Sequence, residues 1–136
     1  ADNADLTGTV VSTGGTAGTL TLSGTSTVSG AVAGLTTLNA GATGETATFN
    51  STVAATNLEV SGTGNVALNG SFTGQLDLNN NAATVTFADN ANLTGTIVGT
   101  GGTAGTVTFA GTSTISSTVA GVTTINAGAA GCRVRV

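Results

Sequence analysis

The sequence predicts an all-β chain that folds as a right-handed parallel β-helix (a β-solenoid) of about six coils. Two observations carry this prediction. Residues 1–49 align without a gap onto residues 88–136, and 32 of those 49 pairs are identical. Short segments in which apolar residues alternate with threonine or an acid recur between glycine-containing turns, which is the pattern of strands with one buried face. No stretch shows the 3.6-residue period of a helix.

The internal repeat has a period of 87 residues and preserves the apolar positions. Where the two copies differ, one apolar residue mostly replaces another, as Ile97 replaces Val10 and Phe109 replaces Leu22. A disordered linker has no reason to keep such positions apolar. We therefore expect residues 1–136 to form a single solenoid segment, in which each coil buries its apolar side chains beneath the next coil.

The expected strands follow one another along the chain. They are residues 19–22, 46–49, 58–60, 76–78, 84–87 and 106–109. The coils can be cut to begin at Thr16, Leu35, Asn57, Leu76 and Thr103, at intervals of 19, 22, 19 and 27 residues. These intervals together fill the 87-residue repeat, so we expect the repeat to contain a whole number of coils.

The composition agrees with many short strands around a narrow core. Threonine (30 residues) favours strands and glycine (22 residues) favours the turns between them. Charged residues make up only 6% of the chain, whereas disorder normally combines few apolar residues with high net charge. An antiparallel sandwich would use the same short strands, but it does not explain coils of similar length that add up to a long repeat.

The charge distribution excludes several classes of partner. Residues 1–132 contain six acids and no base, and the only cations are Arg133 and Arg135. Such a surface cannot neutralise phosphates, so we expect neither nucleic acid nor anionic lipid as a partner. No apolar stretch is long enough to span a bilayer, so we expect no membrane insertion of this segment.

Several segments of the sequence resemble a known protein family. The similarity is to the passenger regions of rickettsial surface-antigen autotransporters of the outer membrane protein A and B type. The segments that resemble these passengers are residues 88–95 (ADNANLTG), 105–109 (GTVTF) and 122–131 (VTTINAGAAG), and residues 35–41 repeat the last of them. The resemblance covers nearly all of the chain except its last residues. It implies an extracellular β-helical passenger on the bacterial outer cell surface that acts in adhesion, with host-surface partners, or as a surface coat.

The second copy departs from the first at its end. From Cys132 to Val136 five consecutive positions mismatch, and they introduce the only cysteine and both arginines. The sequence leaves open whether this segment is native or a truncation. Because the chain contains no methionine, we expect it to be a fragment of a longer passenger.

No constellation of catalytic residues is present in the sequence. The chain has no histidine and no lysine, so the usual general bases and triads are missing and we expect no enzyme and no cofactor. Two carboxylate pairs, Asp2 with Asp5 and Glu59 with Asp77, could meet through folding, but like charges at such spacing are more typical of a solvated face. Cys132 has only Arg133 beside it, which favours a structural over a reactive thiol.

Oxygen-rich segments at residues 2–5, 77–80 and 89–92 raise the question of calcium. They match neither the EF-hand loop nor the glycine-rich calcium-binding repeat, so turns stabilised by Asp and Asn are the favoured interpretation and no metal ligand is assigned.

The Thr-x-Thr triplets are the one surface feature with a specific alternative function. They lie at residues 19–21, 46–48, 84–86 and 106–108. Stacked on successive coils they would form a hydroxyl and methyl array like that of ice-binding solenoids, although their irregular spacing favours ordinary β propensity. A filament subunit is another alternative, because a solenoid with open ends is expected to associate head to tail.

Overall fold

The computed structural model describes residues 3–13, 18–80, 82–100, 104–128 and 133–135. Every regular element within these residues is a β-strand, and every strand pairing is parallel. Among the same residues there is no apolar helix of the length needed to cross a bilayer.

The strands form two sheets between which the chain alternates. Sheet A contains, in spatial order, β1 (Asp5–Leu6), β4 (Ser26–Val28), β6 (Thr46–Phe49), β8 (Asn65–Leu68), β10 (Thr84–Phe87), β12 (Ala104–Phe109) and β14 (Val122–Ala127). Sheet B contains β2 (Val10–Val11), β5 (Val32–Ala40), β7 (Val53–Val60), β9 (Phe72–Leu78), β11 (Leu93–Gly99), β13 (Thr114–Ala120) and β15 (Arg133–Arg135), and β3 (Thr19–Thr21) also pairs with β5.

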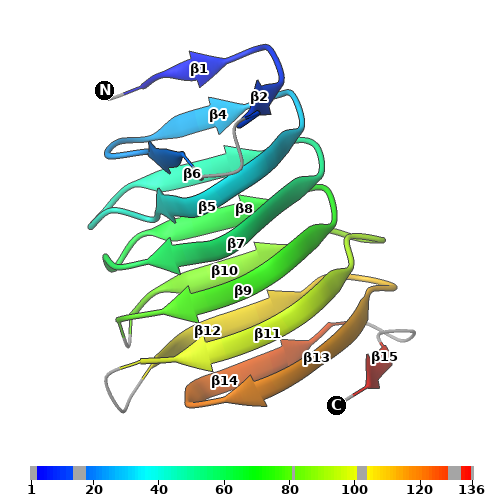
Figure 1. Ribbon diagram of the computed structural model, residues 1–136. Helices are drawn as coiled ribbons and strands as arrows, with labels where there is room; N and C mark the ends of the chain where they lie inside the picture. The colour runs from blue at the N-terminus through cyan, green and yellow to red at the C-terminus, as the bar shows by residue number, and fades with distance from the viewer. Residues whose placement is uncertain (1–2, 14–17, 81, 101–103, 129–132, 136) are drawn as a thin grey trace.

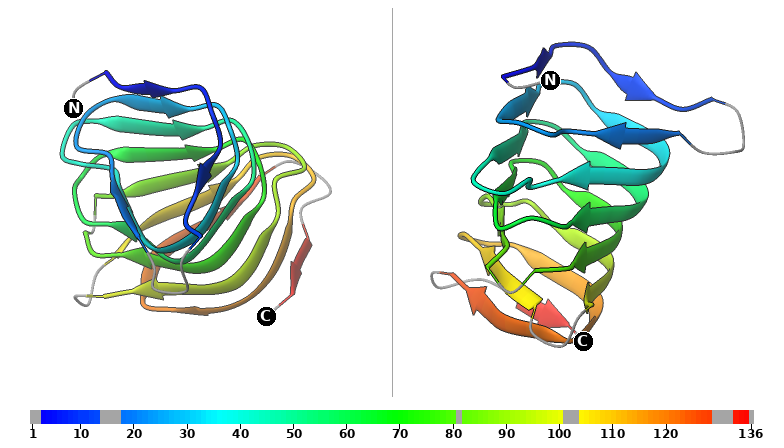
Figure 2. Two further views of the ribbon diagram at one scale, coloured as in Figure 1. Left: turned by 45° about the horizontal axis from the view of Figure 1, so that its top comes forward. Right: turned by 90° about the vertical axis from the view of Figure 1, so that its left-hand side faces the viewer.

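One strand of each sheet makes one coil, and about six such turns stack along the axis. In Figure 1 the chain runs left to right along sheet A, right to left along the nearer sheet B, and descends with each turn, which is a right-handed coil. Figure 2 shows the same stack from two other sides, with the two termini at opposite ends. The predicted right-handed parallel β-helix is confirmed.

The core is a set of apolar columns that run through the stack. In sheet A the inward column passes from Val28 through Phe49, Leu68 and Phe87 to Phe109, and all five are buried. The rings of Phe87 and Phe109 stack with centroids 4.6 Å apart and an interplanar angle of 13°. Each fully buried side chain of this size stabilises the fold by roughly 1.5–3 kcal/mol.

Sheet B faces sheet A across this core and is bent, whereas sheet A is regular. Register shifts interrupt the pairing of β5 with β7 and of β7 with β9. Glycines occupy the bend: Gly34 has φ +73° and Gly74 has φ +137°, a region that side chains disfavour. A Cβ at Gly74 would also collide with the carbonyl oxygen of Ala55 in the neighbouring coil.

The expected coil boundaries are wrong at each interval that the described residues test. Leu76 has its register partner in Ile97, so the coil that begins at Leu76 does not extend for the 27 residues to Thr103. Thr103 and Thr16 themselves lie outside the described residues. The other expected boundaries also lie in sheet B but miss the register. Leu35 pairs with Ala55 and not with Asn57, and the partner of Leu76 is Leu58 and not Asn57.

The 87-residue repeat is consequently not a whole number of coils. Leu6 lies in sheet A beside Val28, but its equivalent Leu93 lies in sheet B between Phe72 and Ile115. Alternating apolar residues can form a strand of either sheet, because both sheets bury one face against the same core. The local pattern therefore does not specify in which sheet a segment lies.

Candidate functional site

The most ordered surface of the molecule is the outer face of sheet A. Pairing from β4 to β14 proceeds without a register shift, so outward side chains stack in two straight columns. Between the columns the buried residues Ala47, Val66, Val85 and Val107 point inward. The first column contains Thr46, Asn65, Thr84, Thr106 and Thr124, and the second contains Thr27, Thr48, Ala67, Thr86, Thr108 and Asn126. Thr25, just before β4, extends the first column, because its hydroxyl accepts from the backbone N–H of Thr46 at 3.4 Å.

These two columns are called the threonine face from here on. Three of the four predicted Thr-x-Thr triplets belong to it, those in β6, β10 and β12. The fourth, Thr19–Thr21, forms β3 and pairs with β5 in sheet B. Sequence reasoning missed Thr25, Thr27 and Thr124. Aligning the strands on their buried central residue would have found all three, because each flanks such a residue in its own coil.

Geometry makes the threonine face a two-dimensional lattice. Outward residues of one strand are two positions apart, about 6.6 Å, and neighbouring strands are about 4.8 Å apart. Threonine is branched at Cβ and has few rotamers, which holds its hydroxyl and methyl groups in place. Asp5 continues the second column at its N-terminal end, and from Thr27 to Asn126 that column has no charge.

The outer face of sheet B has a different character, because it carries the predicted carboxylate pair. Glu59 and Asp77 are register partners on β7 and β9. The amide nitrogen of Asn79 donates to Glu59 Oε1 at 2.8 Å, and the hydroxyl of Thr100 donates to Asp77 Oδ1 at 2.8 Å. Folding therefore brings the two acids together, but each is bonded to a neutral neighbour and no general base or nucleophile lies between them among the described residues.

Two further acidic and amide side chains, those of Asp89 and Asn92, bond to the backbone of the next coil. Asp89 Oδ1 accepts from the backbone N–H of Thr112 at 2.7 Å, and Asn92 Oδ1 accepts from the N–H of Thr114 at 2.7 Å. Asn90 has φ +62°, a conformation that asparagine tolerates in turns. The turn interpretation is confirmed at Asn90 and at Asn80, whose Oδ1 accepts from the backbone N–H of Ala82 at 3.1 Å. The bonds of Asp89 and Asn92 instead join neighbouring coils. Within the described part of the chain no three His, Cys, Asp or Glu side chains gather to hold a metal ion.

Asp2 and Cys132, two of the predicted candidates, lie outside the described residues. Asp5 is exposed at the first strand of sheet A. The partner expected for Asp5 in the first carboxylate pair thus cannot be placed.

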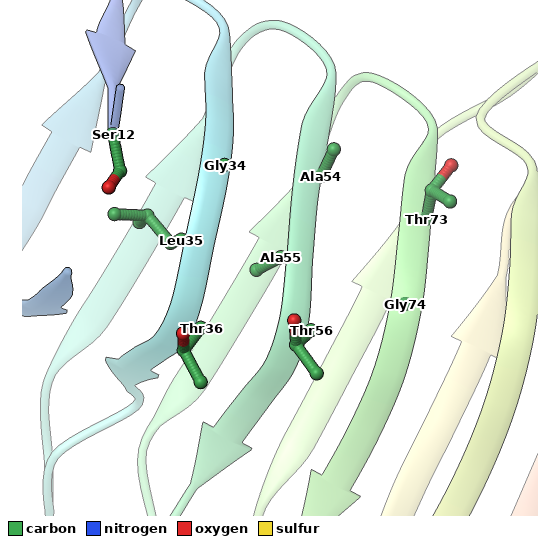
Figure 3. Close-up of a pocket in the computed structure, with 9 residues that line it drawn as sticks. All are labelled: Ser12, Gly34, Leu35, Thr36, Ala54, Ala55, Thr56, Thr73 and Gly74. Atoms are coloured by element: carbon green, nitrogen blue, oxygen red, sulfur yellow. The ribbon is translucent and has the colours of Figure 1, made fainter. Parts of the chain in front are cut away.

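A shallow groove of about 610 Å³ follows the bend of sheet B. Figure 3 shows its lining across three consecutive strands, β5, β7 and β9, together with Ser12 after β2. Threonine is the only polar residue type that these strands contribute to it: Thr36, Thr56 and Thr73. Without a titratable group in its lining, this groove has no means of acid–base catalysis.

Both ends of the rod leave part of the core uncovered. Leu6, Val10 and Leu20 at the N-terminal end, and Val119, Val122 and Ile125 at the C-terminal end, are only partly buried. In the central coils their column neighbours Leu68, Phe72 and Leu76 are 0% exposed. Val11, at the N-terminal edge, is 54% exposed. The ends are therefore the apolar surfaces of the molecule.

No protein-family model matches this chain. No curated protein and no solved structure is significantly similar to it.

Proposed function

We propose that this chain is a non-enzymatic structural and adhesive segment of an exported bacterial surface protein, similar to an autotransporter passenger. The observation that supports this proposal best is the distribution of the polar groups. They form columns along a rod whose core is continuous, instead of converging on a concave site. A rod of this kind presents repeated, shallow contacts over its length, which suits adhesion or a surface coat on the outer cell surface.

We further propose that the rods associate end to end. The partly buried apolar residues at both ends favour cover by another coil, since leaving them in water forfeits about 25 cal/mol for each Å² of apolar surface. Edge strands also carry backbone groups that can pair with a further parallel strand. Continuing the sheet A columns places Ala127 of one molecule next to Leu6 of a second copy, and Asn126 next to Asp5 of that copy.

Charge contributes to the same contact. Asp5 lies in the first strand, and the last strand, β15, contains both Arg133 and Arg135. Attraction between unlike ends should weaken as the ionic strength rises towards ~1 M, where screening acts within ~3 Å. Salt does not screen the burial of apolar side chains at the ends. Salt should therefore weaken the association without abolishing it.

Analytical ultracentrifugation of matched alanine variants tests the end-to-end contact. Ala127 and Ala54 are both exposed, but Ala127 lies on the terminal strand β14 and Ala54 lies in the central strand β7. Ala127→Lys should convert the assemblies to monomers at concentrations where Ala54→Lys still associates. A wild-type chain that stays monomeric at every protein and salt concentration would rule the contact out, as would equal association of both variants.

The exported-passenger proposal has its own test in the gene. A signal peptide upstream and an outer-membrane translocator domain downstream in the same open reading frame would support it. A short gene that encodes only this rod would count against it.

A further inference from the structure

We propose that the threonine face of sheet A binds ice. This function is separate from the adhesive role, which needs no particular face. Its basis is the two-dimensional order of the threonine columns, which the irregular spacing of the triplets in the sequence conceals.

The lattice of the face suits a crystalline ligand. Its repeats of about 6.6 Å along a strand and about 4.8 Å between strands are of the order of the oxygen repeats on the surface planes of hexagonal ice. Five consecutive strands, from β4 to β12, continue this lattice without a bulge. A flexible polymer has no such periodic surface, whereas the surface of a crystal repeats in two dimensions and can contact the whole array.

The chemistry of the face suits ordered water. Each threonine presents a hydroxyl group, which both donates and accepts hydrogen bonds, beside a methyl group that limits the motion of adjacent water. Among the hydrogen bonds between described residues, none involves the hydroxyl groups of Thr48, Thr84 or Thr86, so these groups face water. The two columns contain no charged residue from Thr27 to Asn126. The carboxylate of Glu45 borders the face at its N-terminal edge, where it accepts from the hydroxyl of Thr25 at 2.6 Å.

A crystalline polysaccharide is the competing ligand, and the composition disfavours it. Sugar rings pack against exposed aromatic side chains, but the chain has no tryptophan and no tyrosine. Its four phenylalanines, Phe49, Phe72, Phe87 and Phe109, are all buried in the core. The threonine face therefore offers no stacking platform for a sugar.

Only sheet A qualifies for this function. The outward columns of sheet B contain Glu59 and Asp77, and its register shifts break the lattice. Three positions of the threonine face are not threonine: Asn65 and Ala67, both in β8, and Asn126 in the last strand β14. The interruption at β8, in the middle of the array, makes a gain of activity testable.

Thermal hysteresis and ice-crystal shaping, measured by nanolitre osmometry, test the proposal. Thr86 in β10 and Thr96 in β11 are half-buried, outward-facing threonines of the same coil but on opposite sheets. Thr86→Lys should lose hysteresis several-fold, while the matched control Thr96→Lys should retain it. The double variant Asn65→Thr/Ala67→Thr should increase hysteresis several-fold, because it fills the gap at β8 in both columns.

Far-UV circular dichroism of each variant separates loss of binding from loss of the fold. The proposal is overturned if the folded wild-type chain neither shapes ice nor shows hysteresis. Equal hysteresis in the Thr86 and Thr96 variants would overturn it too. Retention on microcrystalline cellulose that Thr86→Lys abolishes, without any effect on ice, would assign the face to a polysaccharide instead.

Discussion

The two copies of the internal repeat have nearly the same sequence but occupy different places in the coil. Leu6, in the first copy, lies in sheet A on a terminal strand and is partly buried, whereas its equivalent Leu93 lies in sheet B and is 0% exposed. Residues 32–40 form the single strand β5, while the equivalent residues 119–127 are divided between β13 and β14 at Gly121. The same sequence is thus used as a continuous strand in one place and as a corner in another.

The pairing between neighbouring coils is nevertheless the same in both copies. Leu6 pairs with Val28 as Leu93 pairs with Ile115. In the same way Val10 pairs with Val32, and Ile97 pairs with Val119. Each pair in the second copy is the first-copy pair shifted by 87 residues.

Positive φ is also preserved at two pairs of equivalent residues. Asn3 and Asn90 both have positive φ, +57° and +62°, and Gly34 and Gly121 have φ +73° and +72°. The local sequence therefore sets the spacing to the neighbouring coil. It does not fix every special backbone conformation, because Gly95 and Gly111 have positive φ and their equivalents Gly8 and Gly24 do not. The place of each segment around the coil depends on the coils already stacked above and below it.

Charged substitutions at the two equivalent leucines should give the largest contrast. Leu93→Asp places a carboxylate without a partner in the core and should cost more than about 4 kcal/mol of unfolding free energy. Leu6→Asp lies on a two-residue terminal strand that can fray, so about 1 kcal/mol is expected. Denaturant unfolding followed by far-UV circular dichroism measures both losses. Equal losses would show that the two copies occupy equivalent places after all.

Alanine substitutions at two equivalent glycines should give the next largest contrast, because the changes in unfolding free energy should have opposite signs. Gly95 has φ +139°, and a Cβ there would collide with the carbonyl oxygen of Gly74, so Gly95→Ala should cost about 1–3 kcal/mol for the backbone strain alone. Gly8 has no heavy atom within 4 Å of a built Cβ. Gly8→Ala should therefore be neutral or stabilise by up to about 1 kcal/mol, through the unfolded chain. Thermal melts of the two variants report the difference.

A second glycine pair is the control for this experiment. Gly34 and Gly121 both have positive φ, and a Cβ at either would collide with the carbonyl oxygen of equivalent residues, Ser12 and Gly99. Gly34→Ala and Gly121→Ala should therefore destabilise the fold by similar amounts. A large difference between them would contradict the preserved local geometry.

The fold was predictable from the sequence because alternation and repetition are local signals. Strands at 46–49, 84–87 and 106–109 were predicted and are present as β6, β10 and part of β12. The sheet in which each strand lies, and therefore the point at which each coil begins, was not predictable in this way. A strand that buries every second residue can belong to either sheet. The expected coil that begins at Leu76 was therefore given the wrong end, because the register partner of Leu76 in the next coil is Ile97.

The candidate site was predictable only in part, for a related reason. Residues 46–48 and 84–86 have the same Thr-x-Thr pattern, but β8, the strand between them, contains no threonine and breaks the series. Thr19–Thr21 has the pattern and lies in sheet B. A pattern of single residues cannot show a shared face until the inward columns have aligned the strands.

Hydrogen bonds that are equivalent in the two copies should give the smallest difference. The amide of Asn39 donates to Thr21 Oγ1 at 3.2 Å, and the amide of Asn126 donates to Thr108 Oγ1 at 3.3 Å. Thr21 lies on the terminal strand β3 and Thr108 lies on the internal strand β12. Comparing the two hydrogen bonds therefore shows whether the strength of a local contact depends on its place in the stack.

Valine at either threonine keeps the branched shape and removes the acceptor, and the amide then bonds to water. Thr21→Val and Thr108→Val should therefore each cost about 0.5 kcal/mol or slightly more, since an exposed hydrogen bond has little net effect on stability. A double-mutant cycle with Asn39→Ala or Asn126→Ala isolates each coupling energy. A coupling above about 1.5 kcal/mol in the second copy alone would mean that the stack alters this contact, and that local sequence does not set it.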